Sequence, residues 1–238
     1  MIKVAPRKRH QVTFIVGLRC KDGIVLCSDS LETDGLNKKN VKKLFKHEEH
    51  GKWGLAFGCS GSTAACTKFG DRLYGLLRKT KSYNRTELET SIEATIAYMR
   101  TDYPDERLSA VVGLWNKHPA EIQLYRAISE NQCVSIESDY SCAGLDVSLG
   151  RFLLDSVFIQ DKVSVFEGAY LSTFVTLAMK EKADGVGGPT QMLMYQIGDT
   201  KWNDVNLHSL EGQMFPFSEL EKEVQRYCWS RFPHQVRK

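Results

Sequence analysis

Residues 13–29 have the sequence TFIVGLRCKDGIVLCSD. Two apolar runs, 13–18 and 24–28, lie on either side of a turn that contains Asp22 and Gly23. An Asp-Gly pair between apolar runs is a strong β-hairpin signal, because a tight hairpin turn needs residues that accept a positive φ. The segment therefore predicts two antiparallel strands, with Thr13 at the start of the first and Asp29 directly after the second.

Strand and helix patterns follow one another along the rest of the chain. Helices are expected where apolar residues recur at three- and four-residue spacing. Thr86 and Ser164 are each followed three residues later by glutamate, which is the pattern of a capping box at a helix start. The predicted elements after the hairpin are a polar loop over 32–40, strands over 41–46, 53–59, 108–115, 121–128, 133–136 and 191–197, and helices beginning near 62, 86, 146, 164 and 217.

The order of these elements is strands, two helices, strands, two helices, strand, followed by a terminal helix over 217–229. Two sheets packed between two helix pairs would bury the apolar stripes of the four internal helices. We therefore expect an α+β fold with four layers, and the length of 238 residues is compatible with one large domain.

Composition excludes several classes of function. The formal net charge is only +3, so charge alone favours neither a nucleic-acid partner nor a membrane surface, and the lysines around 38–46 are interpreted as a solvated face. The longest charge-free stretch, 53–67, is shorter than the ~18 residues of a membrane span. Residues 1–12 lack the apolar core of a secretion signal, so a cytoplasmic protein is expected.

Cofactor and metal motifs are also missing from the sequence. The chain has 7 cysteines but no C-x-x-C pair, which argues against a zinc knuckle and against a disulfide framework. It contains no Walker loop, no G-x-G-x-x-G and no H-E-x-x-H. We therefore predict no cofactor and no metal.

Five short motifs occur in a characteristic order: TFIVGL from Thr13, DGIVLCSDS from Asp22, Lys43-Leu44, FGCSG over 57–61, and DGVGG from Asp184. Together they resemble the β-type subunits of the proteasome family, which are N-terminal-nucleophile hydrolases. The resemblance implies a four-layer αββα sandwich, with residues 1–12 as a leader and residues 13–238 as a single hydrolase domain.

The same resemblance implies a threonine peptidase whose catalytic residues are Thr13, Asp29, Lys43, Gly61 and Asp184. A threonine hydroxyl is a weak nucleophile, but an α-amine exposed by removal of the leader, with a pKa of about 7.7–8.0, can act as its base. A cation at Lys43 would lower the pKa of that amine, and Asp29 would supply the counter-charge. The N–H of Gly61 would stabilise the oxyanion, and Asp184 would orient the threonine.

Thr33, Cys59 and Thr63 are predicted, by the same resemblance, to line the substrate cleft. Backbone groups at Thr33 and Thr63 would bind an extended peptide, and Cys59 would form the floor of the specificity pocket. The implied partners are a peptide or protein substrate and further subunits, in a ring-forming homo-oligomer or a proteasome-like assembly.

Four positions depart from the family pattern. Val12 stands where active members have glycine, Leu31 where arginine is frequent, and Ala143 and Gly187 where serines surround the threonine amine. Lost hydroxyls remove groups that could hold the amine and a water. These departures favour a non-catalytic structural subunit as the alternative. A further alternative on the same fold is an amidohydrolase or transpeptidase.

Overall fold

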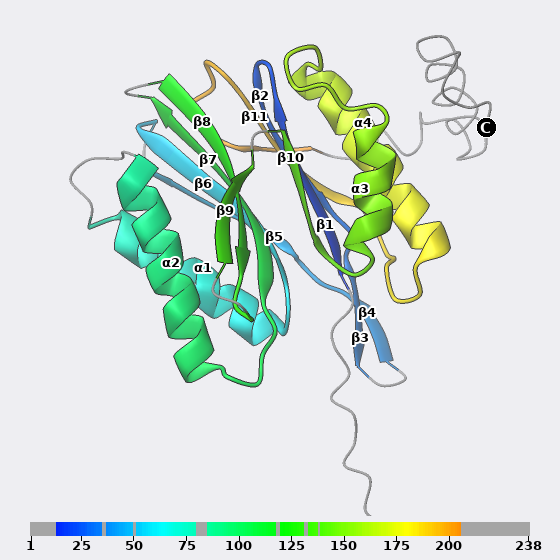
Figure 1. Cartoon of the computed structure of the whole chain (residues 1–238), viewed down its shortest axis with the longest axis horizontal. Helices are drawn as coiled ribbons and strands as arrows, with labels where there is room; N and C mark the ends of the chain where they lie inside the picture. Colours follow the sequence, from blue (N-terminus) through cyan, green and yellow to red (C-terminus); the bar gives the residue numbers. More distant parts are fainter. Residues whose placement is uncertain are drawn as a thin grey trace, which may run out of the picture.

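Two sheets lie face to face between two pairs of helices (Figure 1). The computed structural model describes residues 13–34, 37–49, 51–79, 85–117, 120–130, 133–137 and 139–205. The first sheet contains, in spatial order, β10 (Tyr140–Gly144), β1 (Phe14–Cys20), β2 (Gly23–Ser28), β11 (Gln191–Gln196) and β12 (Asn203–Asp204). The second contains β5 (Leu44–Glu49), β6 (Trp53–Ser60), β7 (Ser109–Lys117), β8 (Ala120–Ile128) and β9 (Cys133–Glu137).

The helices form the two outer layers. The second sheet is covered by α1 (Thr63–Leu77) and α2 (Arg85–Asp102), and the first by α3 (Val147–Asp155) and α4 (Val165–Lys182) (Figure 1). This arrangement confirms the α+β class and the four-layer αββα order.

Three apolar layers separate the four layers of secondary structure, because side chains alternate between the faces of a strand. On β1, Phe14 and Val16 pack toward α3 and α4, whereas Ile15 packs between the two sheets. On β6, Phe57 packs toward the α1 and α2 side, whereas Ala56 faces the other sheet. The central strands β1, β2, β6 and β7 are therefore buried on both faces, which explains why they are almost continuously apolar.

The hairpin predicted from residues 13–29 is confirmed, with β1 and β2 antiparallel and Cys20 opposite Gly23. The prediction of a loop over 32–40 is wrong. Its residues form a second hairpin of β3 (Leu31–Asp34) and β4 (Asn37–Asn40), and all four β4 side chains are exposed. A strand with two solvated faces has no apolar alternation, so the sequence pattern carried no signal for it.

Helix starts were predicted with mixed success. The Ser164 capping box is confirmed, since its hydroxyl accepts from the Glu167 N–H and the Glu167 carboxylate accepts from the Ser164 N–H. The start near Thr86 is one residue late, because α2 already includes Arg85. The predicted leader and the terminal helix over 217–229 lie outside the described residues. In the part of the chain that the structure describes, no helix is long and apolar enough to cross a membrane.

Candidate active site

Thr13 lies immediately before β1, at the end of the first sheet, and is 3% exposed. Its carbonyl oxygen accepts a hydrogen bond from the N–H of Leu145 at 2.8 Å. The neighbouring Gly144, opposite Phe14 in β10, has a φ of +101°, and a Cβ added there would overlap the Thr13 carbonyl. A glycine at this position lets β10 approach the backbone of Thr13 closely.

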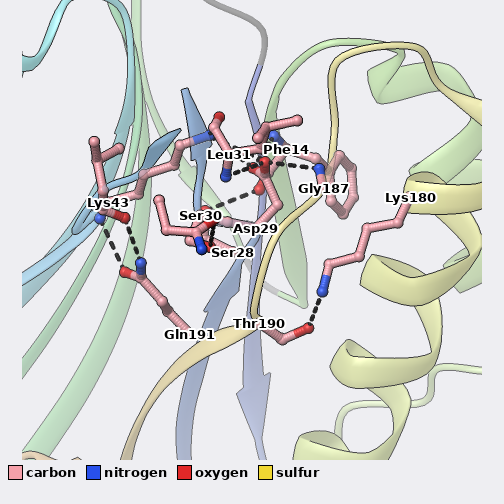
Figure 2. Close-up of polar contacts among 12 residues, drawn as sticks. Phe14, Ser28, Asp29, Ser30, Leu31, Lys43, Lys180, Gly187, Thr190 and Gln191 are labelled. Atoms are coloured by element: carbon pink, nitrogen blue, oxygen red, sulfur yellow. Dashed lines mark hydrogen bonds and ion pairs between the residues drawn. The ribbon is translucent and has the colours of Figure 1, made fainter. Parts of the chain in front are cut away.

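Asp29 follows β2 and is fully buried. Its Oδ1 accepts from the N–H of Phe14 at 3.0 Å, and its Oδ2 accepts from the N–H groups of Leu31 at 3.2 Å and Gly187 at 3.1 Å (Figure 2). Three backbone donors therefore hold the carboxylate in place. One of them belongs to the residue next to Thr13, which ties the position of the threonine to that of the carboxylate.

Lys43 supplies the charge partner of Asp29. Its Nζ lies 3.1 Å from Oδ1 and 3.0 Å from Oδ2 of Asp29, and it donates to the carbonyl of Leu31 at 2.5 Å. Both members of the pair are buried. Burial lowers the pKa of Lys43, whereas the Asp29 carboxylate and, after it, Glu32 favour the charged ammonium. The predicted pairing of Lys43 with Asp29 is present in the structure.

A single pocket brings most of the predicted residues together. Its walls include Thr13, Lys43, Cys59, Gly61 and Thr63. Gly61 lies in the turn between β6 and α1. Its φ is +143°, a value that favours glycine. Burial, and after it the neighbouring Cys66 thiol, raises the pKa of Cys59, so this pocket residue stays neutral.

Two predicted residues are placed differently from this group. Asp184 is exposed in the turn after α4, and the same turn contacts the site through the N–H of Gly187, which donates to Asp29. Thr33 lies on β3 with its backbone opposite Lys38, and its side chain is outside the described part of the chain. The roles given to these two residues remain predictions.

Two of the four departures from the family pattern, Leu31 and Gly187, are neighbours in space, and Val12 lies outside the described residues. A Cβ at Gly187 would lie 3.1 Å from Cδ2 of Leu31, and the Gly187 carbonyl accepts from the N–H of Ser30 and the N–H of Leu31. Ala143 is fully buried opposite Ile15, between the two sheets. Leu31 thus packs directly against the place where a residue 187 side chain would begin.

Three further residues of the site were not predicted from the sequence. Glu32 lines the pocket, where its carboxylate accepts from the Thr63 hydroxyl at 2.9 Å and pairs with Lys39 at 2.9 Å. Ser28 donates its hydroxyl to the carbonyl of Phe14. Gln191 binds the backbone on both sides of Lys43. Ser28 adjoins Asp29 and Glu32 adjoins Thr33, so proximity along the chain could have indicated these two residues but not Gln191.

In the described ranges, no three His, Cys, Asp or Glu side chains gather as a possible metal site.

Comparison with known proteins gives the fold and a family match. The family model described as "Proteasome subunit" matches residues 10–125, just under half of the chain. No curated protein sequence matches the chain significantly.

Solved structures of the protein Anbu have the same fold as this chain. An Anbu mutant from Hyphomicrobium sp. strain MC1 is 17% identical, with a TM-score of 0.75, and the match covers 95% of this chain and 98% of that one. Anbu from Yersinia bercovieri, described as an ancestral β-subunit, is 15% identical with a TM-score of 0.71 over 94% and 98%. A helical assembly of the Anbu complex from Pseudomonas aeruginosa is 16% identical with a TM-score of 0.66 over 94% and 98%. The chain therefore has the fold of these structures, and its resemblance to proteasome subunits is confirmed over residues 10–125.

Proposed function

From the premise that this chain has a proteasome-subunit fold, we propose that it is a threonine-type peptidase with Thr13 as its N-terminal nucleophile. The observation that carries the proposal is the buried Lys43–Asp29 pair beside Thr13. A buried ion pair is weak evidence for stability, because desolvating two charges costs several kcal/mol, on the order of the attraction gained. Its place beside the pocket that Thr13 lines favours a chemical role.

The first step of the mechanism is removal of residues 1–12. Cleavage between Val12 and Thr13 exposes an α-amine. The ammonium of Lys43 lowers the pKa of that amine by charge repulsion, so more of it is neutral at pH 7 and can take the hydroxyl proton. Asp29 keeps Lys43 charged despite its burial.

Peptide cleavage then passes through an ester on Thr13. The hydroxyl oxygen attacks the peptide carbonyl while its proton moves to the α-amine, and the N–H of Gly61 receives the negative oxygen, a role worth about 3–4 kcal/mol in other enzymes. The C–N bond breaks as the proton passes to the leaving amine. A water then attacks the ester and releases the second product.

Intact mass spectrometry and a peptidase assay test the proposal together. We expect purified wild-type protein to lose residues 1–12 and to hydrolyse fluorogenic peptides. Thr13→Ala should keep the full chain and hydrolyse nothing, whereas Thr13→Ser keeps a hydroxyl and should retain activity. Thr90→Ala, on the exposed face of α2, is the matched control and should behave as wild type. Wild-type protein that keeps residues 1–12 and cleaves no peptide would contradict the proposal.

A structural subunit is the second candidate, and Ala143 and Gly187 favour it because neither supplies a hydroxyl near the threonine. In that case Thr13→Ala would change neither the mass, nor the assembly, nor any activity. An amidohydrolase or transpeptidase would instead show the same Thr13 dependence with amide substrates or amine acceptors in place of peptides and water.

Assembly is proposed for either candidate, since one Anbu structure is described as a helical assembly. We place the protein in the cytoplasm, as a ring-forming homo-oligomer or proteasome-like assembly that takes peptide or protein substrates and binds neither nucleic acid nor membrane. Light scattering after size exclusion should give a mass well above the 27.0 kDa of one chain. Cell fractionation tests the location.

A further inference from the structure

Gln191, the first residue of β11, makes hydrogen bonds on both sides of Lys43 (Figure 2). Its Oε1 accepts from the N–H of Lys43 at 2.9 Å and from the N–H of Leu44 at 3.3 Å. Its Nε2 donates to the carbonyl of Val41 at 2.5 Å. One amide thus satisfies two donors and one acceptor in the short connection between β4 and β5.

That connection leads from the β3–β4 hairpin into the second sheet and carries Lys43. Asp29 lies at the end of β2 in the first sheet, whereas Leu44, next to Lys43, begins β5 in the second. Gln191 pairs with Ser28, the residue before Asp29, across the β2–β11 ladder. The amide therefore fixes the backbone of Lys43 relative to the strand that holds its charge partner.

The result is a closed loop of contacts. It runs from Asp29 to Ser28 along the chain, from Ser28 to Gln191 across the sheet, from Gln191 to the Lys43 backbone through the amide, and from the Lys43 ammonium back to Asp29. A lysine side chain has four carbons and adjusts easily, so the ion pair alone leaves the position of the ammonium loosely defined. Fixing the backbone removes much of that freedom.

We propose that Gln191 is a positioning residue that sets where the Lys43 ammonium stands relative to the α-amine of Thr13. This inference rests on the proposed peptidase function. Without the amide, Lys43 can keep its contact with Asp29 while its backbone shifts, and the cation then acts less strongly on the amine. The pKa of the amine rises toward its ordinary value, and a smaller fraction of the base is neutral at pH 7.

The test compares Gln191→Met, which keeps the length and loses all three hydrogen bonds, with Gln196→Met at the other end of the same strand. Both are assayed for kcat and KM against pH. An amine at its ordinary pKa of about 7.7–8.0 is still about one tenth neutral at pH 7. We therefore expect kcat at pH 7 to fall by up to about 10-fold in Gln191→Met with KM unchanged, and the acidic limb of the profile to move to higher pH. Gln196→Met should match wild type.

The pKa of the amine can also be measured without turnover. The rate at which an isocyanate modifies the α-amine of Thr13 depends on the neutral fraction, so its pH dependence reports the pKa directly. Gln191→Met should shift this dependence to higher pH, and Gln196→Met should not. A purely structural role for Gln191 would lower the melting temperature without moving this curve, and that result would overturn the inference.

A double variant asks whether Gln191 acts through Lys43. If it does, Gln191→Met added to Lys43→Met lowers kcat no further, because the group being positioned is already absent. Independent, multiplied losses would overturn the inference. If Gln191→Met fails to fold, Gln191→Asn takes its place, since its amide stays neutral and polar but is one methylene too short for the same contacts, and it should shift the profile in the same direction.

The outcomes separate the two proposals. Active wild-type protein with an unchanged Gln191→Met profile overturns the positioning role alone. Wild-type protein with a free Thr13 and no peptidase activity overturns the proposed function and, with it, this inference.

Discussion

Lys43, just before β5, and Lys46, on β5, each pair with a carboxylate of the first sheet. The partner of Lys43 is Asp29, just after β2, and that of Lys46 is Asp204 on β12. Lys46 pairs with Asp204 at 2.7 Å and also donates to the carbonyl of Trp202, and the two side chains are 27% and 69% exposed. The side chains of Lys43 and Asp29 are 6% and 0% exposed. Both pairs join the two sheets, but only one does so away from water.

Because of this difference in burial, the two pairs contribute differently to the stability of the fold. An exposed pair keeps most of its hydration, so forming it costs little and stabilises by only about 0–1 kcal/mol. A buried pair loses its hydration and needs hydrogen bonds for every oxygen and proton, as the donors around Asp29 provide. The buried pair is therefore sensitive to the loss of either partner, and the exposed pair is not.

Asp29→Asn should give the largest effect. It leaves the Lys43 ammonium buried without a counter-charge, and breaking a buried pair in this way costs about 3–5 kcal/mol. Urea unfolding measures the change, and peptide hydrolysis should fall below detection. Asp204→Asn is the matched control at the exposed pair, where the loss should stay within about 1 kcal/mol. Equal losses for the two variants would remove the distinction between the pairs.

Lys43→Met should reduce stability less than Asp29→Asn, because Asp29 keeps its three backbone donors. Activity at pH 7 should nevertheless fall by about 10-fold or more, since an amine with the ordinary pKa of about 7.7–8.0 is mostly protonated there and the Asp29 carboxylate, no longer neutralised, raises that pKa further. Steady-state kinetics on protein with a free Thr13 measures this. Activity within a few-fold of wild type would show that the buried pair is structural.

Gly144→Ala tests whether Thr13 is fixed by its backbone neighbours as well as by the buried pair. The added Cβ would overlap the Thr13 carbonyl, and the φ of +101° adds strain, so we expect a loss of about 1–3 kcal/mol together with most of the activity. Gly198→Ala is a matched control, because its φ is +105° but nothing lies within 4 Å of the added carbon. It should lose stability without losing activity. Unchanged hydrolysis in Gly144→Ala would contradict the close approach.

Lys46→Met should give the smallest effect. Removal of the exposed pair should change the free energy of unfolding by about 0–1 kcal/mol, and added salt should shrink even that difference by screening. Peptide hydrolysis should equal that of wild type. A loss of several kcal/mol would mean that Lys46 joins the sheets as firmly as Lys43 does.

Local sequence patterns predicted much of the fold and part of the site. Thr13, Asp29 and Gly61 are assigned to the site by the resemblance of short motifs to a known family. The β1–β2 hairpin and the turn between β6 and α1 place these motifs at the ends of their strands. These signals lie within a few residues of the group they locate. The four-layer order followed from helix and strand periods in the same way.

Contacts between distant segments gave no such signal. Gln191 lies 148 positions from Lys43, and nothing near it in the chain indicates that its amide faces the β4–β5 connection. The sequence pattern predicts a polar loop at Glu32. In the structure Glu32 lies on β3, lines the pocket and accepts a hydrogen bond from the Thr63 hydroxyl. Such residues are positioned by the packing of two sheets, which the local pattern does not specify.

The contact between Leu31 and Gly187 has a consequence for how this site could change by mutation. A serine introduced at 187 must first push the end of Leu31 aside by a few tenths of an ångström, so its benefit depends on which residue occupies 31. The two substitutions are therefore epistatic. A route that shortens Leu31 before adding the hydroxyl is open, whereas the reverse order passes through an overcrowded intermediate.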